Sequence, residues 1–295
     1  MNKHAYLVTA HSNWEQLKLL LGALDHINND IFLHIDRKAF SPSDEEINSW
    51  VTKSKMFIYH KYRVAWGGDT QVKCNLFLLR KAVEHNYAYY HLISGVDIPL
   101  KTQNEIHRFF EASNGKNFIG VNLRCNITLD HLDRIRYYHL LQNYVGRPPE
   151  TPTLGIKVLC KVENLSLQLQ KFLKINRIYN KSYTFYKGSS WFSITHKFAT
   201  FVVAQKRSIL KSLKFSLGGD EYLMQTLIMN SEFSTTLVND NLRYIDWSSS
   251  DQPGAPKTFT IDDYDAIVNS DKLFARKFDL NKDSTIIYKL YQNLT

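Results

Sequence analysis

The first 120 residues alternate short apolar runs with amphipathic segments, and this alternation restricts the chain to few folds. Four apolar runs have the length of strands: residues 5–9, 31–36, 56–60 and 87–93. Four intervening or following segments have helical periodicity or helix signals: residues 14–24, 45–51, 69–83 and 103–110. Strands that alternate with helices in this way form right-handed crossovers and parallel pairs. We therefore predict an α/β domain with a mostly parallel central sheet flanked by helices.

Polar residues follow the predicted strands at the points where ligands collect in such sheets. His11, Asp36 and Asp97 each come directly after an apolar run, and the carboxyl ends of parallel strands lie at one edge of the sheet. His34 and Asp36 also form a His-x-Asp pair. This pair could hold a metal, bind a ribose or base edge, or be a buried pair with its hydrogen bonds satisfied. The sequence leaves these alternatives open.

A second candidate element is the stretch at 215–228. Gly218 and Gly219 break the backbone, Asp220 is a good helix N-cap, and apolar residues then recur four positions apart. Glu221 is therefore expected at the mouth of a helix, where a carboxylate on a rigid element can act as a general base. The simpler interpretation is that the two acids only complement the helix dipole.

Composition limits the partners and the compartment without choosing among them. A net charge of +9 favours an anionic partner, which could be a nucleotide diphosphate, an acidic lipid surface or nucleic acid. The 17 Tyr and 17 Phe are typical of chains whose aromatic rings stack on sugars or bases. Cys74, Cys125 and Cys160 form no close pair, so reduced thiols are expected. The chain has no signal peptide and no apolar run of membrane-spanning length. We predict a cytoplasmic protein, with any membrane contact peripheral and on the inner face.

Sequence motifs for several enzyme classes are missing. Dinucleotide-binding, P-loop, serine-hydrolase and zincin motifs are not found. Asp263 and Asp265 have D-x-D spacing but lie on a predicted helix, so we interpret them as an exposed acidic helix start. Lys257, Arg276 and Lys277 could neutralise a diphosphate leaving group without a metal. We expect neither a metal nor an organic cofactor.

Eight short segments, in the same order along nearly the whole chain, resemble the core-2/I-branching glycosyltransferases. This family includes the branching β-1,6-N-acetylglucosaminyltransferases and the peptide O-xylosyltransferases. The matching segments are residues 5–8 with His11, 34–38, 66–68, 90–101, 188–192, 220–221, 243–247 and 274–279. The chain differs from Golgi members in lacking their membrane anchor, stem and disulfide cysteines, which points to a bacterial-type member.

The resemblance implies a GT-A-type fold, a UDP-sugar donor, inversion at the anomeric carbon and no metal requirement. It makes Glu221 the catalytic base and Lys277, with Lys257 as its partner, the diphosphate-binding pair. The full assignment on the donor side is His11, His34, Asp36, Asp97, Lys257, Arg276 and Lys277. The assignment on the acceptor side is Asp220, Trp191 and Trp247.

On this basis we predict one GT-A-like domain over residues 1–295. Residues 1–122 would form the nucleotide-binding half, and residues 123–295 the acceptor and catalytic half. Residues 130–182 are interpreted as a helical insertion, or as the part of the domain that contacts acceptor or membrane, with a basic amphipathic helix at about 162–175. A solvated helical surface is at least as good an explanation.

The predicted reaction is transfer of a sugar, with N-acetylglucosamine favoured, from a UDP-sugar to a hydroxyl of a glycan or lipid-linked glycan in bacterial surface polysaccharide synthesis. A non-catalytic module that binds polysaccharide or nucleic acid is the alternative. It is disfavoured, and no nucleic-acid partner is expected, because Lys and Arg do not cluster into one stripe of the sequence.

Overall fold

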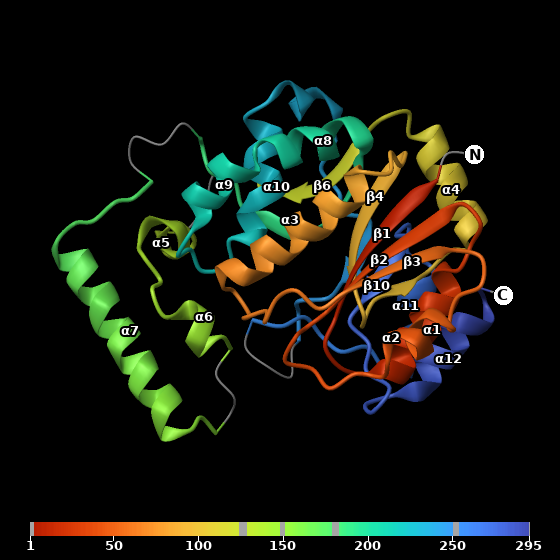
Figure 1. The fold of residues 1–295 in the computed structure, drawn as a ribbon, viewed down its shortest axis with the longest axis horizontal. Coiled ribbons are helices and arrows are strands. Elements are labelled where there is room, and N and C mark those ends of the chain that lie inside the picture. The colour runs from red at the N-terminus through yellow and green to blue at the C-terminus, as the bar shows by residue number, and fades with distance from the viewer. Residues whose placement is uncertain (1–2, 124–128, 148–150, 179–182, 250–253, 295) are drawn as a thin grey trace.

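The computed structural model describes residues 3–123, 129–147, 151–178, 183–249 and 254–294 (Figure 1). Its strands are β1 (His4–Ala10), β2 (Asn29–Ile35), β3 (Lys55–Tyr59), β4 (Tyr89–Ser94), β5 (Ile98–Pro99), β6 (Asn117–Val121), β7 (Gly188–Thr195), β8 (Leu237–Val238), β9 (Arg243–Ile245) and β10 (Phe274–Arg276). They form a seven-stranded sheet in the order β3-β2-β1-β4-β7-β6-β8 and a three-stranded sheet in the order β5-β10-β9.

Helices cover both faces of the large sheet. They are α1 (Trp14–Leu24), α2 (Asp44–Asn48), α3 (Asp69–Val83), α4 (Gln103–Ala112), α5 (Leu129–Arg136), α6 (Gln142–Val145), α7 (Leu154–Phe172), α8 (His196–Ala204), α9 (Lys206–Leu213), α10 (Asp220–Met229), α11 (Tyr264–Val268) and α12 (Ser284–Gln292), with short 3₁₀ turns η1 (Glu232–Thr236) and η2 (Ile261–Asp263). One apolar core lies between the sheet and α3, α8 and α10, and a second lies between the sheet and α1 and α4.

The sheet confirms the predicted α/β architecture. Strand β1 pairs in parallel with β2 and β4, and β2 pairs in parallel with β3. Strand β7 is antiparallel to both β4 and β6, so its first residues lie at the edge where the parallel strands end. The predicted strands are correct in kind, with boundaries displaced by one or two residues. The sheet is mixed, with parallel pairing among β1, β2, β3 and β4 and antiparallel pairing at β7.

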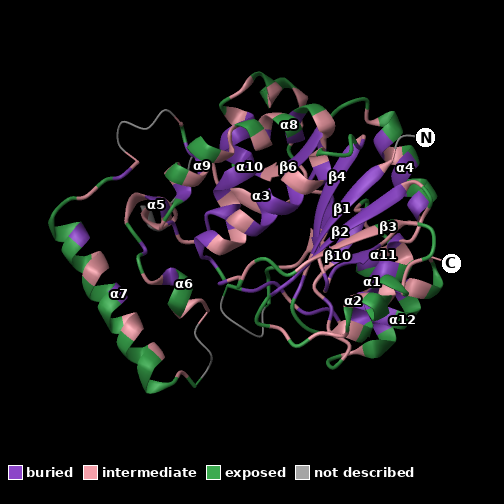
Figure 2. Ribbon diagram, viewed as in Figure 1, coloured by how far each residue is buried: buried purple, intermediate pink, exposed green. Residues whose placement is uncertain are grey.

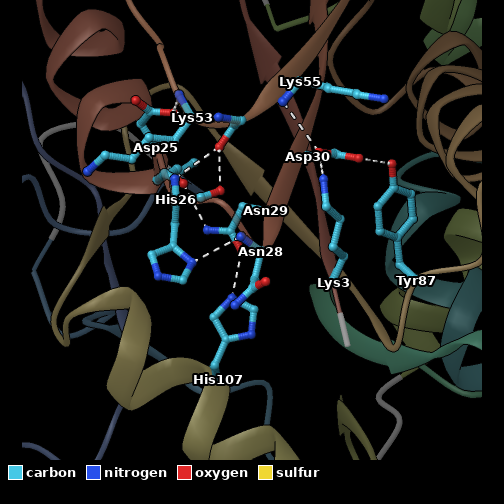
Figure 3. A network of polar contacts seen from close by, with 12 residues as sticks. Lys3, Asp25, His26, Asn28, Asn29, Asp30, Lys53, Lys55, Tyr87 and His107 are labelled. Atoms are coloured by element: carbon cyan, nitrogen blue, oxygen red, sulfur yellow. Dashed lines mark hydrogen bonds and ion pairs between the residues drawn. The ribbon is translucent and has the colours of Figure 1, made fainter. Parts of the chain in front are cut away.

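Polar side chains tie together the opposite edge, where the parallel strands begin (Figure 3). The Asp30 carboxylate accepts hydrogen bonds from Tyr87 Oη at 2.6 Å and Lys3 Nζ at 2.9 Å. Asn29 Oδ1 lies 2.8 Å from His107 Nε2, and the Asp25 carboxylate accepts backbone N–H groups at 52–54. These contacts fix the amino ends of the strands in register, and the loops at the carboxyl ends carry the candidate site.

The buried Arg243 joins the two sheets. From β9 its guanidinium donates to the carbonyl oxygens of Leu92 at 3.0 Å and Phe192 at 2.9 Å, and to Ser193 Oγ at 2.9 Å. Burial lowers the pKa of Arg243 to about 10, so it stays charged at neutral pH. Strand β10, which pairs with β9, is thereby held against the ends of β4 and β7.

Three local expectations are corrected by the structure. Gly219, not Asp220, is the N-cap of α10, because the helix begins at Asp220; the Asp220 side chain accepts hydrogen bonds from Ser190 and Gln71. The amphipathic helix is α7, which begins at Leu154 because Thr153 caps it. The helix expected at 45–51 covers only Asp44–Asn48.

The structure describes two of the three cysteines, and its described helices bear on the membrane prediction. Cys74 and Cys160 are both free thiols, the first buried and the second partly exposed. Cys125 lies outside the described residues. None of the helices in the described ranges combines the length and the apolarity needed to cross a bilayer.

Candidate active site

The Glu221 carboxylate lies between two cations at the start of α10. Its Oε2 is 3.1 Å from Arg134 Nη1 and 3.2 Å from Lys187 Nζ. Arg134 comes from α5 and Lys187 directly precedes β7, so three elements meet at this carboxylate. Oε1 makes no hydrogen bond or ion pair with the described residues, and 31% of the side chain is exposed. The two ion pairs therefore orient the carboxylate and leave one oxygen for another donor.

The loop before α10 has this shape because the turns at Gly67 and Gly218 pack together. Gly218 donates its N–H to the carbonyl oxygen of Gly67 at 2.7 Å, and both residues have positive φ, at 67° and 68°. A Cβ on Gly67 would lie 2.9 Å from Leu217 Cδ1. Leu217 N also donates to the Arg134 carbonyl at 2.8 Å. The positive φ values and this close approach explain why glycine occupies both turns.

Asp220, beside Glu221, has a different environment. It is buried, and its Oδ2 accepts hydrogen bonds from Ser190 Oγ at 2.6 Å and Gln71 Nε2 at 2.9 Å. Burial raises the pKa of Asp220 to about 6, and the neighbouring Glu221 charge acts in the same direction. Asp220 was assigned to the acceptor, but its carboxylate instead links α10 to β7 and α3. It supports the position of Glu221.

A second group, on the other side of β7, brings together Asp97, Arg276 and Trp191. Arg276 Nε lies 3.1 Å from Asp97 Oδ1, and the guanidinium carbon is 4.0 Å from the Trp191 ring centroid. Asp97 is completely buried and also accepts hydrogen bonds from the N–H and hydroxyl of Ser94. Its carboxylate is thus held by Arg276 and Ser94 in this structure.

Lys257 and Lys277 lie on adjacent chain segments. Lys277 N donates to the Lys257 carbonyl at 3.5 Å, and Phe259 N donates to the Lys277 carbonyl at 2.9 Å. Lys257 Nζ is 2.6 Å from Asp263 Oδ1, and this hydrogen bond raises the Lys257 pKa. Asp263, predicted to lie at an exposed helix start, therefore forms an ion pair with Lys257, a residue predicted to bind the diphosphate.

His34 and Asp36 were also predicted to bind the sugar donor, and each makes hydrogen bonds to nearby backbone groups. His34 is 1% exposed and its Nε2 accepts the Tyr62 N–H at 3.0 Å. Burial lowers the pKa of His34 to about 4, so this ring is neutral at pH 7. Asp36 accepts the N–H groups of Lys38 and Val64 and shapes the loops after β2 and β3.

His11 and Trp247 are exposed. Trp247 follows β9 and is next to Asp246, whose carbonyl accepts the Lys257 N–H at 2.8 Å. It therefore borders the two lysines. His11 directly follows β1, at the carboxyl edge of the sheet. Both positions leave the side chains accessible to a ligand.

Sequence reasoning did not assign Arg134, Lys187, Ser190 or Gln71 to the site. No local pattern marks Arg134 or Gln71, because each is brought to the acidic pair by tertiary packing. Lys187 and Ser190 flank the start of β7 within or next to a family-like segment, and that position is a signal that could have identified them.

The described residues include no group of three His, Cys, Asp or Glu side chains placed to hold a metal ion. A cavity of about 600 Å³ lies at the other end of the sheet, lined by His4, His107 and Thr195 among others. It contains none of the residues of the two groups described above. The carboxyl edge offers instead one oriented carboxylate, Glu221, together with Arg276, Lys257 and Lys277 on neighbouring segments.

The family model named Core-2/I-Branching enzyme matches residues 4–267. The chain belongs to this family. Beta-glucuronosyltransferase GlcAT14B of Arabidopsis thaliana is 25% identical over 98% of this chain and 65% of its own length. Human xylosyltransferase 2 is 24% identical over 83% of this chain and 26% of its own length.

A third relative is the human N-acetyllactosaminide beta-1,6-N-acetylglucosaminyl-transferase, 25% identical over 94% of this chain and 68% of its own length. The chain thus spans about two thirds or less of the first curated relatives it matches. The family match confirms the family suggested by the eight sequence segments.

Proposed function

We propose that this glycosyltransferase transfers a sugar from a UDP-sugar to a hydroxyl of a glycan or lipid-linked glycan, with inversion and without a metal. The observation that carries the proposal is the orientation of the Glu221 carboxylate. Arg134 and Lys187 hold its Oε2, and Oε1 has no hydrogen bond or ion pair with the residues that the structure describes. A single oriented base is what a one-step displacement requires.

In the proposed reaction, Glu221 Oε1 accepts the proton of the acceptor hydroxyl. The acceptor oxygen forms a bond to the anomeric carbon as the bond from that carbon to the diphosphate oxygen breaks on the opposite face. The electron pair of the broken bond leaves with UDP. Because the acceptor oxygen attacks in a single displacement, from the face opposite the leaving diphosphate, the configuration at the anomeric carbon is inverted.

The leaving diphosphate gains negative charge as the bond breaks, so cations near it stabilise the transition state more than the bound donor. Lys257 and Lys277 on adjacent segments support this role. Lys257 binds Asp263 and Arg276 binds Asp97 in this structure. Donor binding would therefore include a change of partner for Lys257, whereas Arg276 can keep Asp97 and present its remaining N–H groups.

N-acetylglucosamine is the sugar we propose first, in synthesis of a bacterial surface polysaccharide. The names of the relatives include glucuronosyl, xylosyl and N-acetylglucosaminyl transfer. Donor tests should therefore use UDP-N-acetylglucosamine, UDP-glucose, UDP-galactose, UDP-xylose and UDP-glucuronate, with release of UDP as the readout. A module that only binds polysaccharide releases no UDP from any of them.

The decisive variant is Glu221→Gln, which keeps the shape of the side chain and removes its basicity. Transfer is expected to fall by about 10²- to 10⁴-fold, the usual effect of a positioned base, while UDP binding by calorimetry stays within about threefold of wild type. Near-normal turnover would refute the assignment of the base.

The matched control is Lys187→Met, which removes one ion pair but keeps the carboxylate. Its transfer rate should fall by no more than about tenfold, because Arg134 still orients Glu221. If the two variants lose the same activity, the carboxylate acts through its ion pairs and not as a base.

A further inference from the structure

Helix α7 presents its apolar residues to solvent. The side chains of Leu154, Val158, Val162, Leu165, Leu169 and Phe172 are each at least half exposed, and Leu154 and Phe172 reach 78% and 81%. We call these six residues the α7 stripe. Their spacings of three and four place them on one side of the helix. The helix lies at one end of the molecule (Figure 1), and much of its length is exposed (Figure 2).

The orientation of α7 is fixed by polar residues on the opposite side. Glu163 and Gln170 are buried. Glu163 Oε2 accepts the Leu141 N–H at 3.0 Å, and Oε1 is 3.5 Å from His139 Nδ1. Gln170 exchanges two hydrogen bonds with the backbone of Tyr138, at 2.7 and 2.9 Å. Most amphipathic helices bury their apolar side, whereas this one is held by its polar side.

The charges beside the stripe have one sign. Lys157 and Lys161 are exposed along one border of the stripe, and Lys171 and Lys174 are exposed near its end. Glu163 is the one acidic residue in Leu154–Phe172, and it is on the buried side. The stripe is about 27 Å long at 1.5 Å per residue. An apolar stripe bordered by lysines is typical of a helix that lies in a membrane interface.

We propose that the α7 stripe docks this protein on an anionic lipid surface. Leucine, valine and phenylalanine side chains would enter the boundary between headgroups and acyl chains, while the lysines contact anionic headgroups. A second copy of the chain fits less well, because pairing two such stripes brings lysines near lysines with no carboxylate on either exposed side. The net charge of +9 acts in the same direction. This inference does not depend on which sugar is transferred.

The test is flotation of the full chain with vesicles of phosphatidylcholine alone and of phosphatidylcholine with 30% phosphatidylglycerol. We expect flotation with the anionic vesicles and a decrease of at least about tenfold for Leu165→Gln/Leu169→Gln, since each removes a buried apolar side chain from the docked state. Lys157→Gln/Lys161→Gln should weaken binding to anionic vesicles by about tenfold or more.

A matched pair of variants separates the stripe from general surface apolarity. Phe172→Ser should reduce flotation, whereas Phe40→Ser, at a 97% exposed phenylalanine on another segment, should not. All four variants should keep wild-type thermal stability and UDP release.

Equal flotation of wild type and Leu165→Gln/Leu169→Gln, or no flotation of either, would overturn the proposal. So would a concentration-dependent dimer in sedimentation that Leu165→Gln/Leu169→Gln abolishes without any binding to vesicles. That result would assign the stripe to a second copy of the chain.

Discussion

Replacement of Asp220 by asparagine is expected to stabilise the protein at neutral pH. The folded-state pKa of Asp220 is about 6, raised by burial from an ordinary value of 3.8. This difference corresponds to about 3 kcal/mol of lost stability when the carboxylate is ionised in both states. Asparagine keeps an acceptor for Ser190 and Gln71 and carries no charge.

One hydrogen bond of the carboxylate is not reproduced. Asp220 also accepts its own backbone N–H, and losing such a bond costs about 1 kcal/mol. Asp220→Asn should therefore be more stable than wild type by about 2 kcal/mol at pH 7.

The advantage should disappear in acid, because the raised pKa means that the folded state binds the proton more tightly than the unfolded state. Wild-type stability attributable to Asp220 is thus gained as pH falls from about 6 towards 3.8. At pH 4.5 about 2 of the 3 kcal/mol are recovered, and the two proteins should then differ little.

The assay is urea unfolding of both proteins at pH 7 and pH 4.5, with Asp265→Asn as the control at an exposed aspartate of α11. The control should change stability by less than about 0.5 kcal/mol at either pH. A difference between Asp220→Asn and wild type that is the same at both pH values would show that Asp220 does not titrate with a raised pKa.

Three further predictions concern the leaving group, the metal and a glycine. Lys277→Ala should weaken UDP binding and slow transfer by about 10²-fold or more, whereas Lys38→Ala, whose side chain is 55% exposed beside Asp36, should stay close to wild type in both assays. Transfer should persist in excess EDTA; loss that manganese restores would show that a metal takes part. Gly188→Ala should lower the free energy of unfolding in urea by at least about 3 kcal/mol, because its Cβ would overlap the Gly120 carbonyl. Gly22→Ala, which has open space around its Cβ, should raise the free energy of unfolding by about 0.5–1 kcal/mol.

Local sequence patterns were sufficient for the frame of the fold. Periodicity located β1, β2, β3 and β4 and the helices between them, because buried strands and helix faces must be apolar at fixed spacings. The direction of the crossovers then placed His11 and Asp36 at the carboxyl edge of the sheet. The glycines before Glu221 also indicated a helix start, because they interrupt regular backbone directly before residues with helical periodicity.

The partners of these residues were set by tertiary structure alone. Arg134 and Glu221 are separated by 87 positions, and Asp97 and Arg276 by 179; no periodicity within one element relates such positions. His34 was ambiguous in sequence because its burial depends on the neighbouring strand and the loop at Tyr62. The outward side of α7 was likewise undecided, because periodicity defines an apolar stripe but not what covers it. That side was determined by the hydrogen bonds that Glu163 accepts from the Leu141 N–H and that Gln170 donates to the Tyr138 carbonyl. Burying two polar side chains is favourable only where the fold supplies their partners.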